Sequence, residues 1–217
     1  MTPSVLIEGR AAALRIENLD TDQIMPKQFL RGIDKSGLKE GVLYDLRHDA
    51  TGAVRPDFVL NRPEFADASI LIGGSNFGCG SSREHAVWGL QQFGIRAVVA
   101  PSYAEIFYSN AMNNRLLLVS LPPETLATLM DLAEDRAGHT VRIDISSQTL
   151  RCGPVEARFE LMPRHRQMFL EGLDSIGLSL TYHDRIRAFA DSHWMRQPWL
   201  RNVAKVSVAK VQRPPLE

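Results

Sequence analysis

The residues best suited to chemistry stand close together in the run Gly78-Cys-Gly-Ser-Ser-Arg-Glu-His85. Arg83 has a planar, doubly donating guanidinium that suits a carboxylate, and the hydroxyls of Ser81 and Ser82 beside it could take part in proton transfer. The glycines allow backbone N–H groups to approach a ligand, and the free N–H groups at the start of a following helix favour negative charge. The run therefore predicts a site for an anion, and the arginine favours a carboxylate.

Other interpretations of this run are a nucleotide-binding loop and a helix cap. A dinucleotide fingerprint would need a glycine where Arg83 stands, and a P-loop would need Gly-Lys-Ser/Thr at the helix start, so neither is met. The structural alternative is that Ser81 caps the helix, that Glu84 closes a capping box, and that the glycines make a tight connection. A cap does not require two serines, an arginine and several glycines together, so the functional interpretation is favoured.

A second polar cluster, Asn18-Leu-Asp-Thr-Asp22, precedes Lys27 and the apolar pair Phe29-Leu30. It places two carboxylates around a hydroxyl. Asn and Asp are also ordinary turn formers, and a lone lysine is usually a solvated surface charge. The residue types alone therefore leave both a solvated loop and a functional segment open.

The elements that must position these residues alternate between strand and helix after residue 70. In order, the sequence predicts a buried strand at Ile70–Ile72, a helix from Ala86 stopped by Gly94, a strand at Ala97–Ala100, a helix from Tyr103 to Met112 capped by Ser102, a strand at Leu116–Val119, and a helix from Pro122-Pro123 to Ala133. This rhythm is typical of parallel strands with crossover helices.

The flanking parts of the chain have other patterns. We expect a strand from Ser4 to Ile16 with a turn at Gly9, a long loop with short pieces of structure from Phe29 to Arg62, antiparallel strands at Thr140–Ile145, Thr149–Cys152 and Val155–Leu161, and helices at Pro163–Leu170 and Leu180–Ala190. The predicted fold class is α/β, with a parallel βαβ centre and additional short antiparallel strands.

Composition restricts the class of partner. The chain has 217 residues, of which 44% are hydrophobic, and its 25 basic residues balance 25 acidic ones. A chain of this size can bury a hydrophobic core. Its balanced charge gives no excess of positive charge that would favour binding to nucleic acid or an anionic membrane. Two separated cysteines fit a reducing compartment, and no apolar run approaches a membrane span. We therefore expect a cytoplasmic protein whose partners are small molecules or other proteins.

Three motifs occur in the order found in one known family. They are Asn18-Leu-Asp-Thr-Asp-Gln-Ile-Met-Pro-Lys-Gln-Phe-Leu30, Gly78-Cys-Gly-Ser-Ser-Arg-Glu-His85 and Arg96-Ala-Val-Val-Ala-Pro-Ser-Tyr-Ala-Glu-Ile-Phe107. From about Val5 to Leu200 the chain resembles the small subunits of 3-isopropylmalate dehydratase, in the aconitase superfamily. The resemblance implies a swivelling β/β/α domain of the aconitase C-terminal type at residues 1–201. Residues 202–217 are then an extension, which we expect to be poorly ordered.

The resemblance also implies an activity. Such a subunit belongs to a heteromeric hydro-lyase that isomerises 2-isopropylmalate to 3-isopropylmalate by dehydration and rehydration in leucine biosynthesis. Its large subunit carries a [4Fe-4S] cluster, and this chain, with two cysteines, lacks the three or four thiolates that a cluster needs. We therefore expect no cofactor or metal on this chain, and a large subunit and a small 2-hydroxy dicarboxylate as its partners.

Residue roles follow from the same resemblance. It implies that Ser81 is the base, that Arg83 binds the substrate, and that Asp22 lies beside the active site. Ser82 and Lys27 are expected on the substrate side, and the segment Phe29-Leu30-Arg31 is expected to select the substrate side chain. Two alternatives stay open: a related dehydratase acting on homoaconitate or a methylmalate, and a non-enzymatic dicarboxylate-binding module.

Overall fold

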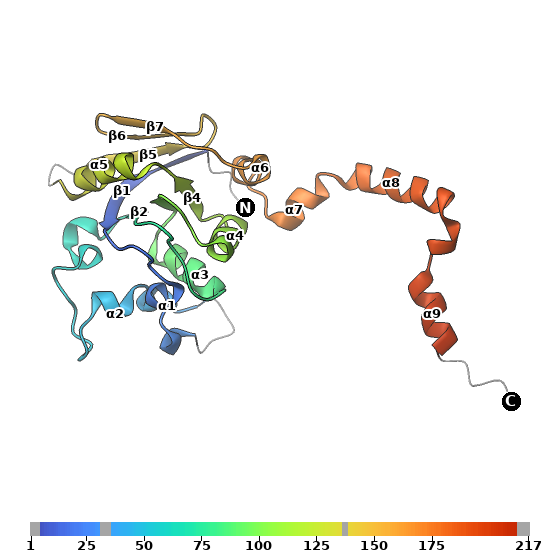
Figure 1. Cartoon of the computed structure of the whole chain (residues 1–217), viewed down its shortest axis with the longest axis horizontal. Coiled ribbons are helices and arrows are strands. Elements are labelled where there is room, and N and C mark those ends of the chain that lie inside the picture. The colour runs from blue at the N-terminus through green and yellow to red at the C-terminus, as the bar shows by residue number, and fades with distance from the viewer. Residues whose placement is uncertain (1–4, 31–35, 136–138, 212–217) are drawn as a thin grey trace. The chain divides into compact units, whose positions relative to one another are not determined.

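The computed structural model, which describes residues 5–30, 36–135 and 139–211, has one mixed sheet of seven strands (Figure 1). The strands are β1 (Leu6–Leu14), β2 (Ile70–Gly73), β3 (Ala97–Ala100), β4 (Leu117–Ser120), β5 (Thr140–Asp144), β6 (Thr149–Cys152) and β7 (Val155–Arg158). Their order across the sheet is β4-β3-β2-β1-β5-β6-β7. Strands β1 to β4 pair in parallel and β5 to β7 pair antiparallel. The predicted α/β architecture is confirmed.

Strand β1 joins the two halves of the sheet. Its first half pairs with β5 and its second half pairs with β2, so it runs without a break through Gly9, which lies opposite Val141. The turn predicted at Gly9 is therefore wrong. A Cβ atom at this position would lie 2.0 Å from Ser69 Oγ. The glycine marks a close approach of a neighbouring side chain to the strand and not a turn.

Three helices cover the parallel half of the sheet. These are α3 (Glu84–Phe93), α4 (Glu105–Asn113) and α5 (Pro123–Glu134). Helices α3 and α4 contact each other, whereas α5 contacts β1, β2 and β3, on the other side of the sheet (Figure 1). All residues of β2 and β3 are buried, as expected for parallel strands covered on both faces. Helix α3 ends at Gly94, which has a φ of 114°, as predicted.

The loops that follow β2 and β3 are tied together by Ser102. The sequence predicts that Ser102 caps a helix beginning at Tyr103, but α4 begins at Glu105 and Ala104 precedes it without a side-chain cap. Ser102 Oγ instead accepts a hydrogen bond from the Asn76 N–H at 2.9 Å, and its carbonyl accepts one from Phe77 at 3.0 Å. A hydroxyl that could cap a helix is used here to fix the glycine-rich loop.

The described residues between β1 and β2 form short elements, as predicted for Phe29 to Arg62. These are α1 (Thr21–Ile24), η1 (Lys27–Phe29), η2 (Lys39–Gly41), α2 (Tyr44–Arg47), η3 (Val59–Asn61) and η4 (Pro63–Phe65). Apolar side chains of this segment, including Val42, Leu43 and Leu60, are nevertheless buried in the main core. The loop is therefore a packed part of the domain.

The chain divides into two units, and the boundary in the sequence lies between Asp174 and Ser175. Helix α6 (Pro163–Glu171) ends the first unit, and the second contains α7 (Ser175–Leu180), α8 (His183–Arg196), η5 (Pro198–Leu200) and α9 (Val203–Val211). The sequence predicts the boundary after residue 201, and the poor order expected beyond it stays a prediction. The helix expected at Leu180–Ala190 is confirmed as α8, but it begins later, at His183, and ends later, at Arg196.

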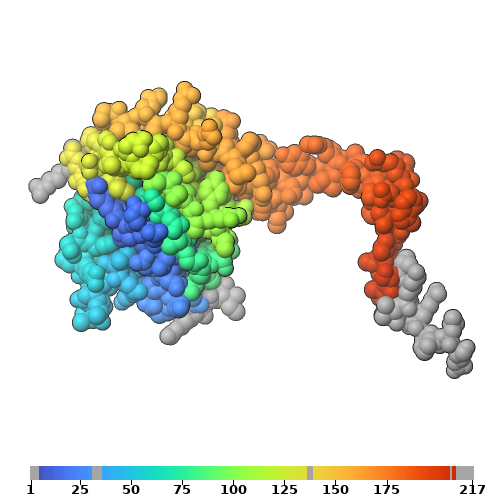
Figure 2. All heavy atoms as spheres, in the orientation of Figure 1, coloured from blue at the N-terminus to red at the C-terminus, as the bar shows by residue number. Residues whose placement is uncertain are grey.

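The described part of the second unit has few buried side chains. Helix α8 has no buried residue, and large apolar side chains such as Ile186, Phe189 and Trp199 are exposed. In Figure 2 the described residues of this unit are coloured from orange to red. In the described chain, no helix combines the length and the apolar character needed to cross a membrane.

Candidate functional site

Two loops lie side by side at the carboxyl ends of β1 and β2. Backbone hydrogen bonds join them: Gly78 donates to Leu19 at 2.7 Å, and Thr21 donates to Cys79 at 2.8 Å. The first loop continues into α1 and the second into α3. The edge formed by the carboxyl ends of parallel strands is where α/β proteins commonly bind ligands. The two polar clusters of the sequence are therefore brought together.

The carboxylates of the first cluster have different uses. Asp20 caps α1, because its Oδ1 accepts the Gln23 N–H at 2.7 Å while Gln23 Oε1 accepts the Asp20 N–H at 3.0 Å. This is a complete capping box. Asp20 therefore serves the helix, and Asp22 is left to interact with the second loop.

Gly78 allows the second loop to pass close to α4. It has a φ of 76°, which disfavours residues with a Cβ atom. A Cβ atom here would also lie 2.2 Å from Cγ of the buried Phe107 ring. Both the backbone conformation and the close packing require glycine.

We expect Gly78→Ala to lower the free energy of unfolding by more than about 2 kcal/mol, because it combines left-handed strain with overlap against a buried ring. Gly37→Ala is the matched control: Gly37 has a φ of 71°, but a Cβ atom there would meet nothing within 4 Å. Urea unfolding of both variants separates strain from overlap. Equal losses would contradict the tight contact with Phe107.

Ser81 does not cap the helix that follows it. Helix α3 begins at Glu84 after Arg83, which provides no side-chain cap, and Glu84 Oε1 accepts a hydrogen bond from Asn114 Nδ2. The structural alternative, a capping box of Ser81 and Glu84, is therefore wrong. Ser81 is exposed, and its Oγ lies 3.1 Å from Oγ1 of Thr21.

The sequence analysis assigns a role to Asp22 but none to the neighbouring Thr21. It is 1% exposed, and its Oγ1 also accepts the Ser81 backbone N–H at 3.1 Å. Its position between the two carboxylates of the first cluster is the only signal that the sequence offers, and that signal does not reveal a partner sixty residues away. Only the folded structure identifies this contact.

Arg83, Asp22 and Lys27 form a charged cluster next to Ser81. Arg83 Nη1 contacts Asp22 Oδ1 in an ion pair, and Lys27 Nζ lies 3.9 Å from Asp22 Oδ2. The Arg83 side chain is 22% exposed, while that of Lys27 is 76% exposed. One carboxylate between two cations leaves net positive charge and orients the guanidinium. Such a cluster can bind a carboxylate of a ligand.

The remaining predicted residues are less directly placed. Ser82 is exposed beside Ser81. Phe29 and Leu30 are half-buried and pack against the core, and the Phe29 ring lies 5.0 Å from the Tyr44 ring, so part of the apolar pair serves packing. Arg31 lies outside the described residues. The substrate-binding roles of these residues stay predictions.

A metal site needs several donor side chains close together. Among the residues with described positions, no three His, Cys, Asp or Glu side chains gather in a way that could hold a metal ion. Cys152 is buried in β6, where burial raises the pKa of its thiol, and Cys79 Sγ donates to the Asn18 carbonyl at 3.2 Å. The two cysteines do not fit the ligand set of an iron-sulfur cluster.

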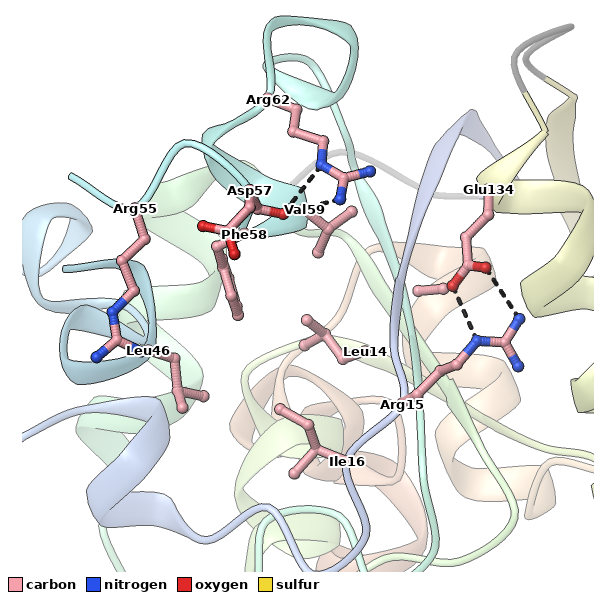
Figure 3. A pocket seen from close by; sticks show the side chains of 11 residues that line it. Leu14, Arg15, Ile16, Leu46, Arg55, Asp57, Phe58, Val59, Arg62 and Glu134 are labelled. Carbon is pink, nitrogen blue, oxygen red and sulfur yellow. Dashed lines mark hydrogen bonds and ion pairs between the residues drawn. The ribbon is translucent and has the colours of Figure 1, made fainter. Parts of the chain in front are cut away.

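A cavity of about 490 Å³ lies elsewhere, between the end of β1 and the segment 55–62 (Figure 3). None of the predicted site residues lines it. The Arg15 guanidinium is held by Glu134 and Asp131, which raise its pKa, and that of Arg62 donates to the Asp57 carbonyl. Because the predicted site residues lie outside this cavity, the candidate site is placed by its chemistry and not by cavity size.

Comparison with known proteins gives consistent matches. Residues 2–124 match the family described as aconitase C-terminal domain. The chain is 57% identical over 207 residues to 3-isopropylmalate dehydratase small subunit 1 of Chromobacterium violaceum, covering 95% of this chain and 98% of that protein. It is 47% identical over 195 residues to the 3-isopropylmalate dehydratase small subunit of Caulobacter vibrioides, covering 89% and 96%.

A solved structure is similar too. The crystal structure of a 3-isopropylmalate dehydratase from Methanocaldococcus jannaschii is 27% identical and superimposes with a TM-score of 0.60, covering 84% of this chain and 98% of that one. The sequence matches and the shared fold thus agree with each other.

Proposed function

The chain belongs to the family of 3-isopropylmalate dehydratase small subunits, which has the aconitase C-terminal fold, and we propose that it supplies the proton-transfer and carboxylate-binding groups of that enzyme. The enzyme is a hydro-lyase that converts 2-isopropylmalate to 3-isopropylmalate by dehydration and rehydration in leucine biosynthesis. The observation that carries the proposal is the docking of the Ser81–Arg83 loop against Thr21 and Asp22. The two lone cysteines support a reducing, cytoplasmic location.

The reaction requires several groups. Dehydration of a 2-hydroxy dicarboxylate needs a base for a carbon-bound proton, cations for the carboxylates, and a Lewis acid for the leaving hydroxyl. Ser81 Oγ serves as the base, and Arg83 binds a substrate carboxylate through its two parallel N–H donors. Asp22 holds the Arg83 guanidinium in orientation by their ion pair, and Lys27 adds positive charge.

A neutral serine is a very poor base, so Ser81 must be ionised during the reaction. The positive charges of Arg83 and Lys27 favour an anion in this region. Ser81 is also exposed, so substrate can reach it. Its second function is to return the proton when water adds back to the double bond.

We infer that the Lewis acid comes from another chain, because a cluster needs three or four thiolates and this chain has two cysteines. We propose that a large subunit carries a [4Fe-4S] cluster, which polarises the leaving hydroxyl when it is bound. The small subunit would then cover the substrate, which would lie between the two chains.

Dependence on a partner can be tested directly. Purified alone, this chain is expected to contain no stoichiometric iron and to show no dehydratase activity, because its two cysteines are too few to hold a cluster. Anaerobic mixing with the large subunit is expected to restore conversion of 2-isopropylmalate. Iron analysis and an activity assay before and after mixing measure this. Turnover by the isolated chain would contradict it.

Substrate selection is expected to depend on Leu30. We propose that the isopropyl group of the substrate packs on the exposed part of Phe29 and Leu30, where each methylene contributes on the order of 1 kcal/mol. Leu30→Arg is expected to lower kcat/KM for 2-isopropylmalate more than for a smaller analogue such as a methylmalate. Leu30→Met, which conserves volume and polarity, is the control. An equal loss for both substrates would indicate a structural role only.

A further inference from the structure

The buried Thr21 side chain makes three contacts to a single residue, Ser81. Thr21 Oγ1 accepts the Ser81 N–H at 3.1 Å and lies 3.1 Å from both the Ser81 carbonyl oxygen and Ser81 Oγ. A hydroxyl has one proton and two lone pairs. Because the Ser81 N–H occupies one lone pair, the Thr21 proton can serve either of the two Ser81 oxygens.

This geometry suits both protonation states of Ser81. When Ser81 Oγ carries its proton, it can donate to the second lone pair of Thr21 while the Thr21 proton serves the Ser81 carbonyl. When Ser81 Oγ is ionised, the Thr21 proton can turn toward it. A hydrogen bond donated to the charged form stabilises that form, and such charge-assisted bonds are roughly twice as strong as neutral ones.

We propose that Thr21 is a positioning residue, which fixes the Ser81 side chain and donates to Ser81 Oγ once that oxygen has lost its proton. This inference rests on the proposed role of Ser81 as base. Ser81 gives its own proton to solvent, and its ionised Oγ then takes the proton of the substrate carbon. The C–H electrons form the double bond as the C–O bond breaks and hydroxide leaves. Addition of water reverses these steps, and Thr21 keeps its own proton throughout.

The first test needs neither substrate nor partner. Cysteine at position 81 titrates in an accessible range, so S81C and the double variant S81C/T21V are compared in the isolated small subunit by thiolate absorbance against pH. Wild type and T21V provide the background of Cys79 and Cys152. The pKa of the introduced thiol is expected to be about one unit higher when the Thr21 hydroxyl is absent, and S81C/T21S is expected to restore it. An unchanged pKa would overturn the proposal.

Other charges cannot account for such a shift. The titratable and charged side chains on the two packed loops are Glu17, Asp20, Asp22 and Lys27 on the first and Cys79, Arg83, Glu84 and His85 on the second. All of them remain in T21V. Valine has nearly the shape of threonine, so the variant replaces the hydroxyl with a methyl group and retains the existing methyl group. Thermal melts of T21V and T21S confirm that both variants fold.

The second test measures turnover in the reconstituted heterodimer. Thr21→Val is expected to lower kcat about 10- to 100-fold with little change in KM, because the hydrogen bond to the charged base is lost. Thr21→Ser is expected to recover most of that loss. Normal kcat in T21V together with an inactive S81A would overturn the role of Thr21 and leave the proposed function standing. An active S81A would instead overturn the role of Ser81 itself.

Discussion

Replacing Ser81 by alanine is expected to lower the kcat of the reconstituted heterodimer about 100- to 10,000-fold, the range associated with loss of a general base. The thermal stability of the small subunit is expected to change little. Ser81 is exposed and does not cap α3, so alanine removes only the hydroxyl contact with Thr21, worth about 1 kcal/mol or less. Steady-state kinetics and thermal melts of the same preparation measure the two effects.

Ser82→Ala is the matched control for this experiment. Ser82 is the adjacent serine of the same loop and is also exposed, so its replacement changes the local composition in the same way. We expect a milder loss of kcat in this variant. Near-normal kcat in Ser81→Ala, or a larger loss in Ser82→Ala, would contradict the assignment of Ser81 as the base.

The regular elements of the fold could be predicted from the sequence because their signals are local. Short apolar runs mark β2 and β3, helical spacing marks α3, and Gly94 ends that helix with a left-handed conformation. Each of these signals depends on residues close in the chain. The predicted alternation of strands and helices therefore matches the observed order.

Predictions about single residues were less reliable where a distant contact decides the outcome. Glycine is a residue type that is common in turns. Gly9 instead lies inside a continuous strand, where the close approach of Ser69 leaves no room for a side chain. Ser102 and Ser81 both precede helices, yet their hydroxyls interact with other loops. Local propensity cannot distinguish a cap from a bond to another loop.

The site as a whole shows the same limit. The sequence predicts roles for Ser81, Arg83 and Asp22, but it does not predict the contact between Thr21 and Ser81. That contact exists because β1 and β2 are neighbours in the sheet, so the loops after them end at the same edge. The boundary between the two units after Asp174 also depends on tertiary contacts, which the local sequence does not show.

Replacing Arg83 by lysine is expected to raise KM for 2-isopropylmalate and also to lower kcat, with a combined loss in kcat/KM of about 10- to 100-fold. Lysine retains the positive charge but cannot offer two parallel donors to a carboxylate, so the substrate is held with less precision. A hydrogen bond to a charged group contributes about 1.5–3 kcal/mol, which corresponds to this loss. Steady-state kinetics of the heterodimer provide both parameters.

Two further variants separate orientation from charge. Asp22→Asn leaves Arg83 in place but removes its anionic partner, so it is expected to weaken substrate binding less than Arg83→Lys does. Arg151→Lys is the control for the substitution itself, because Arg151 pairs with Glu156 in the antiparallel strands and is not part of the site. If Arg83→Lys and Arg151→Lys had the same KM and kcat, the two parallel N–H donors of Arg83 would not bind the substrate carboxylate. An equal loss in Asp22→Asn and Arg83→Lys would show that the ion pair, by orienting the guanidinium, accounts for the whole effect.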